Sequence, residues 1–515
     1  GNTATLQTSI KAVRVAVETG IVNMGTNTIF TEVRTGIAAG ATVISANTGS
    51  SGSNCVFGGE LARQPAQGLE LSGKLVLTGA TPFIQAAVYN IYPGSTIEYA
   101  GTGQNFVNKS LAGTASLTTY ANLTLSGSGN KTPLGNFEVK ENILISGSSV
   151  LVMGNRTAII RGNWTSYGQA GLSEGTSTIN FDSTVAHSIN TTGGENFYIM
   201  RKSNSGTLTL NSNVNIVAGG NLTMQSGVID ANANTFSGTA TSAFNMSGGT
   251  IRLAKLNTTL PEFQVTPYNL TAGTIELDGA GTQTLRGTRD YRNLSFSNSG
   301  TKGISSTINN ITGTVTVANS VILDVLNNTM GGTGTNLTMT GTSLYRTAGS
   351  SQVKPDAAGT YSLSSGTTIE FNNNLTGLES IRLTAAATVN YAKIIVSGTS
   401  VGTASLATGI RFQTGGSFTV KNAAVFKQIN STGFSGLTTT AISSTNNPTI
   451  ILEPGSMIEY NGADQMISTQ TINTPASAHY EGLTLSGAGN KTAPAGNLII
   501  NGNFIKTGSP VFMHN

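Results

Sequence analysis

The densest group of ionisable side chains in this sequence lies in the octapeptide LRGTRDYR. It brings Arg286, Arg289 and Arg292 together with Asp290, and Asp278 lies a few residues before it. A carboxylate flanked by arginines could bind or cleave an acidic sugar, but polysaccharide cleavage needs clustered carboxylates. The segment occurs once and has no second carboxylate next to Asp290. We therefore predict a solvated turn, with the three arginines as candidate contacts for a glycan or a partner protein.

Other residues that commonly do chemistry lack the spacing for it. His187, His479 and His514 are far apart and show no metal-binding pattern. The glycine-rich segments GTGQNF, from Gly101, and GAGTQTL, from Gly279, neither precede a helical pattern nor carry the Lys-Ser/Thr pair of a phosphate-binding loop. We predict turn glycines here, and no catalytic residue, metal site or cofactor anywhere in the chain.

Aromatic residues recur at one place in a repeated phrase. Exposed rings stack on sugars, so these residues are candidate glycan contacts, but their position beside an apolar triplet favours packing in the core or at an edge. The tyrosines in question are Tyr120, Tyr291, Tyr391 and Tyr480, and Phe197 takes their place in one copy.

These aromatics belong to a repeat of about ninety residues. Each copy opens with a phrase related to T-I-E-aromatic, and the aromatic residue above begins a second phrase about twenty residues later. The five first phrases read TIEY, TINF, TIEL, TIEF and MIEY. The stretch YANLTLSGSGNKT from Tyr120 thus returns as YEGLTLSGAGNKT from Tyr480. The glutamate of the first phrase is expected to face outward beside a strand. The isoleucines of the five first phrases are Ile97, Ile179, Ile275, Ile369 and Ile458.

A shorter period inside each copy predicts the fold. Between residues 135 and 164, the apolar triplets Ile143–Ile145, Val150–Val152 and Ala158–Ile160 are separated by glycines. Such triplets indicate very short strands joined by tight bends that need positive φ. We predict an all-β solenoid in which three short strands make one coil of about 20–25 residues. The alternative is a row of immunoglobulin-like β-sandwiches of about 90 residues each.

Composition supports an ordered protein with a polar, weakly charged surface. Charged residues are 10% of the chain, hydrophobic residues 38%, and the net charge is +4, whereas disordered chains combine low hydrophobicity with high net charge. No run of Lys and Arg suggests nucleic-acid binding, and no apolar run is long enough for a transmembrane helix. The single cysteine, Cys55, excludes an internal disulfide and a multi-cysteine zinc site.

The chain is expected to divide near residue 67. Residues 1–67 read as N-terminal coils with a loop excursion, and residues 68–515 as a continuous solenoid of about five repeats. Residues 496–515 align with residues 135–154 and stop before the third strand of that coil. We therefore expect the native polypeptide to continue beyond Asn515.

The phrases YANLTLSGSGNKT, GNFEVKENILISGSSVLV, TAIIRGNW and GTSTINF resemble the repeat regions of very large secreted surface adhesins of Bacteroidota-type bacteria, exported by the type IX secretion system. The resemblance implies a right-handed parallel β-helix, an extracellular location at a bacterial cell surface, and a role in adhesion or fibre construction. It carries over no catalytic residue.

From these patterns we expect a non-enzymatic extracellular adhesin or structural surface-fibre segment that forms a rigid rod. Its partners would be surface glycans, other cell-surface proteins or further copies of itself. Two alternatives remain open: a carbohydrate-active enzyme, lyase or hydrolase, on the same β-helix, and a self-assembling extracellular filament subunit.

Overall fold

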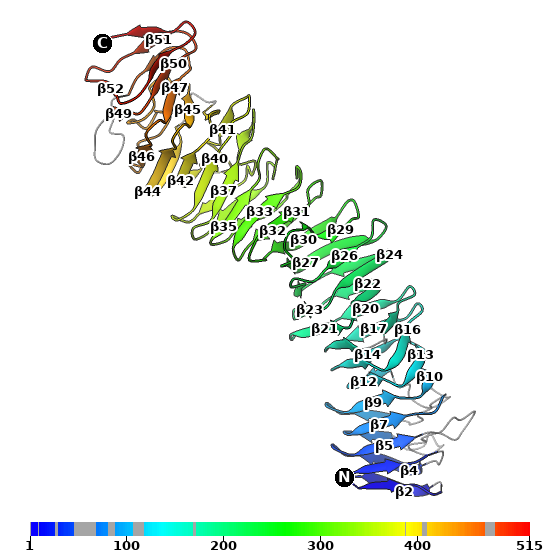
Figure 1. Ribbon diagram of the computed structural model, residues 1–515. Helices are drawn as coiled ribbons and strands as arrows, with labels where there is room; N and C mark the ends of the chain where they lie inside the picture. Colours follow the sequence, from blue (N-terminus) through cyan, green and yellow to red (C-terminus); the bar gives the residue numbers. More distant parts are fainter. Residues whose placement is uncertain are drawn as a thin grey trace. The chain divides into compact units, whose positions relative to one another are not determined.

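The computed structural model places most of the chain in short β-strands (Figure 1). No helix occurs within the residues that it describes, and none of their segments could therefore cross a membrane as a long apolar helix. Cys55 and the predicted loop excursion lie outside the described residues. These are residues 2–8, 10–25, 29–45, 68–80, 88–106, 118–167, 171–386, 388–403, 409–468 and 479–514.

The chain forms two compact units. Unit 1 comprises residues 1–252 and 262–271, and unit 2 comprises residues 253–261 and 272–515. Each unit is a parallel β-solenoid, in which a strand pairs with the equivalent strand of the preceding and following coils. The predicted solenoid is therefore confirmed. The β-sandwich alternative is wrong, because sandwiches are built from antiparallel pairs.

In unit 1, three stacks of strands form the sides of most coils, and a fourth stack of β2 (Ile10–Val17), β4 (Ile29–Ile37), β6 (Gly68–Leu71) and β8 (Val88–Ile91) lies in the N-terminal coils. The first contains β5 (Thr42–Ser45), β7 (Lys74–Leu77), β9 (Thr96–Tyr99), β12 (Asn122–Leu125), β15 (Ile143–Ile145), β18 (Trp164–Ser166), β21 (His187–Thr191), β23 (Thr207–Leu210) and β25 (Val228–Asp230). The second contains β11 (Thr119–Tyr120), β14 (Phe137–Val139), β17 (Thr157–Ile160), β20 (Thr178–Phe181), β22 (Glu195–Lys202) and β24 (Val214–Met224). The third contains β10 (Thr102–Phe106), β13 (Ser128–Pro133), β16 (Ser148–Val152) and β19 (Gly171–Ser173).

Unit 2 repeats this plan. One stack contains β32 (Asn293–Phe296), β34 (Thr314–Val317), β36 (Asn336–Met339) and β39 (Tyr361–Leu363). Another contains β31 (Gln283–Leu285), β33 (Gly300–Ile304), β35 (Val321–Asp324), β37 (Leu344–Thr347), β40 (Thr368–Phe371), β42 (Asn390–Val396), β44 (Arg411–Val420) and β46 (Thr449–Leu452). A third stack contains β38 (Val353–Lys354), β41 (Glu379–Ile381), β43 (Val401–Gly402), β45 (Val425–Gln428), β47 (Met457–Tyr460), β50 (Leu483–Leu485) and β53 (Phe504–Lys506). A fourth contains β48 (Gln465–Met466), β51 (Asn490–Thr492) and β54 (Val511–Met513).

The two phrases of each repeat are neighbouring strands in these stacks. In the first copy Ile97 of β9 pairs with Leu123 of β12, and in the last copy Ile458 pairs with Leu483. The same pairing joins the phrases in the other three copies. The ninety-residue repeat therefore contains a pair of directly stacked coils, and the phrase YANLTLSGSG is the second strand of that pair.

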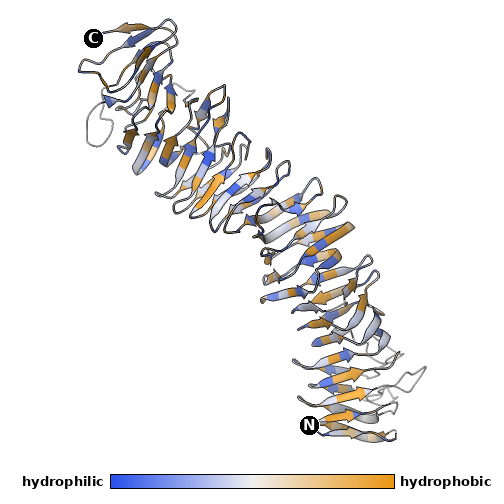
Figure 2. Cartoon of the chain, viewed as in Figure 1, coloured by the Kyte–Doolittle hydropathy of each residue, from blue (hydrophilic) through white to orange (hydrophobic). Residues whose placement is uncertain are grey.

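Side chains alternate along the strands between a buried core and the outer surface. Figure 2 shows hydrophobic and hydrophilic residues mixed along the strands. In β9 and β12 the first and third residues lie outward and the second and fourth are buried. This period of two is that of an extended chain with one covered face. Only alternate residues of the predicted apolar triplets therefore form the core of the coil. In Val150–Val152, for example, Leu151 is buried whereas the two valines face outward.

The bends are stabilised by rows of asparagines. Asn122 Oδ1 accepts the N–H of Asn142 at 3.1 Å, Asn142 Oδ1 accepts that of Asn163 at 3.0 Å, and Asn163 Oδ1 accepts that of Ser188 at 2.9 Å. The partners are 20, 21 and 25 residues apart, which is the length of one coil. Each amide thus provides a hydrogen bond to a backbone group that a tight corner leaves without a strand partner.

Candidate functional site

The four tyrosines proposed as glycan contacts lie in the core. None of Tyr120, Tyr291, Tyr391 and Tyr480 is more than 1% exposed. Their hydroxyls are also engaged, as in Tyr480, which donates to Ser468 O at 2.9 Å, and Tyr391, which donates to Arg382 O at 2.6 Å. The prediction that these tyrosines stack on glycans is therefore wrong, because a sugar cannot reach the buried rings. The tyrosines pack in the core instead.

The arginines of LRGTRDYR bind the backbone of their own surroundings. Arg286 Nε donates to Pro261 O at 2.8 Å, Arg289 Nη1 to Thr288 O at 3.0 Å, and Arg292 Nη1 to Thr312 O at 2.9 Å. Each guanidinium thus satisfies a carbonyl at a bend. The predicted turn is consistent with these bonds, and a partner contact for the three arginines stays a prediction.

The recurring glutamate of the T-I-E phrase lies on the outer side of its strand and bonds the next coil. Glu276 Oε1 accepts the hydroxyl of Ser297 at 2.6 Å, Glu370 Oε1 that of Ser397 at 2.7 Å, and Glu459 Oε1 that of Ser486 at 2.7 Å. Glu98 and Ser126 make the same bond. These glutamates therefore join the two phrases of a repeat.

The most regular polar feature follows the T-I-E strand at the next bend. One polar side chain per repeat is buried there, and two of the five stand in the segments GTGQNF and GAGTQTL, for which only turn glycines were predicted. We call these five the corner residues; none is more than 4% exposed. They are Gln104, His187, Gln283, Glu379 and Gln465.

A glutamine at the corner holds three parts of the coil stack at once. Gln283 Oε1 accepts the N–H of Gly279 at 2.9 Å, while Gln283 Nε2 donates to Leu253 O at 2.7 Å and Lys255 O at 3.0 Å in the preceding coil. Gln104 and Gln465 make the equivalent bonds. All the amide groups of the side chain are used, which is what burial of a polar group requires.

A buried lysine from the following coil completes each glutamine corner. Lys131, Lys302 and Lys491 are in register with Gln104, Gln283 and Gln465. Lys302 Nζ donates to Gln283 Oε1 at 2.8 Å, to Gly281 O at 3.1 Å, and to Gly279 O. Burial lowers the pKa of Lys131 and Lys302 to about 8 and also lowers that of Lys491.

Where the corner residue cannot offer this acceptor pattern, no lysine is in register with it. His187 pairs with Leu208, and Glu379 pairs with Val401. Among the five corner residues, a lysine in register thus accompanies the glutamines, whose amide oxygen accepts a hydrogen bond from the ammonium. This pairing could have been found in the sequence. Each glutamine follows a glycine in GxxQ or GxxxQ, and each lysine stands in NKT or TKG of the following phrase, so the two motifs have to be considered together.

Glu379 shows the reverse arrangement of donors and acceptors. Its Oε1 accepts the N–H of Gly349 at 2.7 Å and the hydroxyl of Thr347 at 3.0 Å, where the glutamines instead donate to carbonyls. Its Oε2 accepts the N–H of Asn373 at 3.3 Å. Burial raises the pKa of Glu379, and these bonds together with the charge of Lys354 oppose the rise.

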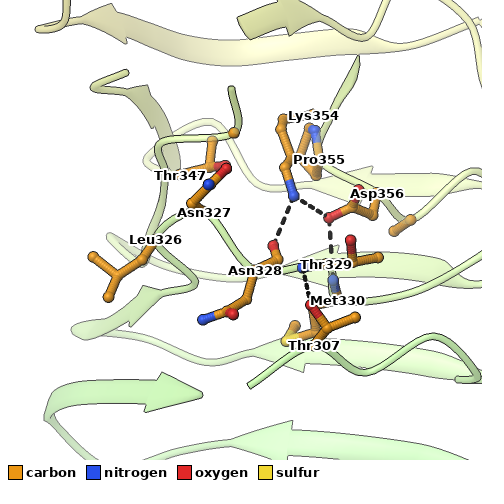
Figure 3. Close-up of polar contacts among 12 residues, drawn as sticks. Thr307, Leu326, Asn327, Asn328, Thr329, Met330, Thr347, Lys354, Pro355 and Asp356 are labelled. Carbon is orange, nitrogen blue, oxygen red and sulfur yellow. Dashed lines mark hydrogen bonds and ion pairs between the residues drawn. The ribbon is translucent and has the colours of Figure 1, made fainter. Parts of the chain in front are cut away.

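Lys202 and Lys354 are buried as fully as the three lysines in register with the glutamines but contact no glutamine corner. Lys202 Nζ donates to Asn204 O, and Lys354 bonds a carboxylate (Figure 3). Its Nζ donates to Asp356 Oδ2 at 2.6 Å and to Asn328 O at 2.7 Å, and the N–H of Met330 donates to the same carboxylate oxygen at 3.1 Å. The ion pair is enclosed by the strands around it. Both charged groups find their hydrogen-bond partners among neighbouring residues of the coils, and the pair stabilises the bend.

The Glu379→Gln substitution is expected to destabilise the protein, because Glu379 accepts hydrogen bonds where the corner glutamines donate them. The amide NH₂ would replace an oxygen that now accepts from a donor, so we expect the unfolding free energy to fall by about 1–3 kcal/mol. Glu453→Gln is the control, because Glu453 pairs with Lys421 at the surface, where exposed ion pairs contribute about 0–1 kcal/mol. Denaturant titration would measure the unfolding free energy of both variants. An equal loss of unfolding free energy in the two would contradict the role of Glu379.

One further carboxyl group, Glu195, is buried in unit 1. Its Oε2 accepts the N–H of Trp164 Nε1 at 3.1 Å in the core, and the residue also borders a surface hollow of about 240 Å³ that Asn196, Asn213 and Asn215 line. Burial raises the pKa of Glu195 to about 7, and the bond from Trp164 opposes the rise. Glu195 is the strongest candidate for a general acid among the described residues.

The raised pKa of Glu195 predicts that stability depends on pH. Between about pH 4.5 and pH 7 the folded protein holds this proton and the unfolded chain does not, so the unfolding free energy should fall as pH rises. The full effect would be on the order of 3 kcal/mol. Glu195→Gln should remove this slope in denaturation measured from pH 4 to pH 8; a slope that survives the substitution would assign it to other groups.

Comparison of the chain with protein-family models, with curated proteins and with solved structures finds no match. Function must therefore be argued from the residues. Within the described parts of the chain, no three or more His, Cys, Asp or Glu side chains are grouped so that they could hold a metal ion. His187 lies in the core, and His479 and His514 are on separate strands and bends.

Proposed function

We propose that this protein is a segment of a non-enzymatic extracellular scaffold, an adhesin or a surface-fibre component of a bacterium. The observation that carries the proposal is the use of polar side chains along the coil stacks. The corner glutamines, the lysines in register with them and the outward glutamates each bond the neighbouring coil. A molecule built in this way is suited to resist unfolding and to present long polar faces.

Surface charges support the same function, because many are paired across coils. Arg161 Nε lies 2.6 Å from Glu138 Oε1, and Arg161 Nη1 lies 3.0 Å from Asp182 Oδ2. Arg346 joins Asp324 and Glu370 in the same way. Such ladders leave a nearly neutral face of hydroxyls and amides, which suits contact with glycans, with other surface proteins or with further copies of the chain.

A binding assay tests the adhesin function directly. The purified protein, labelled with a fluorophore, would be applied to an array of neutral and acidic glycans and to intact bacterial cells. We expect salt-insensitive binding to neutral glycans or to cells, because contacts through hydroxyls and amides carry no net charge. Absence of binding to every glycan and cell type would contradict adhesion, and concentration-dependent lengthening of particles in electron micrographs would favour the filament alternative.

The enzyme alternative has one specific observation in its favour, the buried Glu195 beside a surface hollow. It predicts cleavage of polymers such as polygalacturonate or alginate, measured by the release of reducing or unsaturated ends. We expect no turnover. Cleavage that Glu195→Gln abolishes while the variant remains folded would overturn the non-enzymatic proposal.

A further inference from the structure

Three corners place a lysine amine directly against a glutamine side-chain amide. The distance from Nζ to Oε1 is 2.7 Å between Lys131 and Gln104. It is 2.8 Å between Lys302 and Gln283, and 2.8 Å between Lys491 and Gln465. None of the six side chains is more than 2% exposed. An amine and a carboxamide held together without water have the proximity that speeds a reaction between them.

The surrounding backbone activates the amide for attack. Its Oε1 accepts a backbone N–H from Gly101 at 2.8 Å in the first copy, and from Gly279 and Gly462 at 2.9 Å in the third and fifth. A fixed N–H donor at this oxygen would stabilise the negative charge that develops when a nucleophile adds to Cδ. The donor is already in place before any reaction.

The nitrogen that would leave is held by acceptors. Gln104 Nε2 donates to Leu77 O at 2.9 Å and to Gly79 O at 2.6 Å, and Gln283 Nε2 makes the same two kinds of bond. Carbonyl oxygens in these positions would stabilise the positive charge on Nε2 as it takes up a proton. Amide, oxyanion donor and leaving-group acceptors therefore surround one carbon.

The lysine is suited to be the nucleophile. An amine attacks only in its neutral form, and desolvation of lysine in a buried site favours that form. Burial lowers the pKa of Lys131 and Lys302 to about 8, so a part of the amine is neutral near pH 7.5. Lys491 is lowered in the same direction.

We infer that Lys131–Gln104, Lys302–Gln283 and Lys491–Gln465 are sites of isopeptide bond formation between adjacent coils. In each, a bond forms between Nζ of lysine and Cδ of glutamine, and the bond from Cδ to Nε2 breaks. One proton passes from Nζ to Nε2, and ammonia leaves. The step needs no oxidant, reductant or further reactant, and it does not rest on the proposed function.

The chain contains its own controls. In the second and fourth copies Leu208 and Val401 stand in the register position of the lysine, so no cross-link can form there. Lys354 is equally buried, but it meets the Asp356 carboxylate, whose negative charge opposes attack by a nucleophile and whose condensation would release water instead of ammonia. Cross-linking is thus expected at three defined places and at no other corner.

The mass of the intact, denatured wild-type protein tests the inference without any variant. Each bond removes ammonia, so we expect a loss of about 17 Da per site and about 51 Da in all, with linked proteolytic peptides that contain each pair. Lys302→Met should reduce the loss to about 34 Da, while Lys354→Met should leave it unchanged. A mass loss that maps to a Lys–Gln pair supports the inference. A mass equal to that of the sequence, with all three glutamines recovered in unlinked peptides, overturns it.

Discussion

Replacing Gln283 by leucine is expected to destabilise unit 2 by about 3–5 kcal/mol, because it breaks a buried network by removing its centre. The substitution leaves Leu253 O and Lys255 O without the amide donor and Gly279 N without its acceptor. It also leaves the buried Lys302 with one oxygen fewer. The unfolding free energy from denaturant titration would measure the total, and hydrogen exchange around residues 279–304 would locate it.

A double variant separates the role of the network from simple loss of volume. In Gln283→Leu with Lys302→Met, the lysine that has lost its acceptor is itself removed, so part of the lost stability should return. The two substitutions would then be less costly together than the sum of their separate effects. A Gln283→Leu protein within about 0.5 kcal/mol of the wild type would show that the corner carries no such network energy.

Gly162→Ala is the second substitution with a large expected effect. A Cβ at Gly162 would lie 1.7 Å from Glu141 O in the preceding coil, so the backbone of one coil must move. Overpacking against backbone atoms costs about 1–3 kcal/mol and sometimes more, and a contact this short places the variant at or above about 3 kcal/mol. The expected result is a lower denaturation midpoint and reduced amide protection in β15 and β18.

Gly171→Ala is the matched control in the same unit. A Cβ there meets no atom within 4 Å, and the backbone of Gly171 is not in the left-handed region. We expect its unfolding free energy to stay within about 0.5 kcal/mol of the wild type. Equal destabilisation by the two alanines would mean that loss of glycine itself, and not the close approach of coils at Gly162, causes the effect.

Bends in this protein use glycine for two physical reasons. Gly147 and Gly154 have φ values of 68° and 60°, which L side chains rarely adopt. Gly162 instead allows two coils to approach each other. The spacing of apolar triplets located all three bends. It could not tell a glycine needed for positive φ from a glycine needed for the close approach of two coils, because each appears in the sequence as a glycine between strands.

Local sequence determined the strands, the bends and the coil length, because each depends on residues within a few positions of one another. The triplet Ile143–Ile145 and the return of the phrase at Tyr120 and Tyr480 are sufficient for a solenoid of short strands. Burial of the tyrosines was favoured from their place beside an apolar triplet for the same reason. The sequence alone also located the outward glutamate of the T-I-E phrase.

Only the tertiary structure decided what the polar side chains contact. Gln283 and Lys302 are 19 residues apart, yet the parallel stacking of coils puts them 2.8 Å from each other in the core. Sequence period indicates that coils stack, but not which residue of one coil lies against which residue of the next. That register is set by the number of residues in each bend, which varies between copies. It places the glutamine that follows a glycine-rich turn against a lysine of the next coil, and so forms the buried Lys–Gln pair.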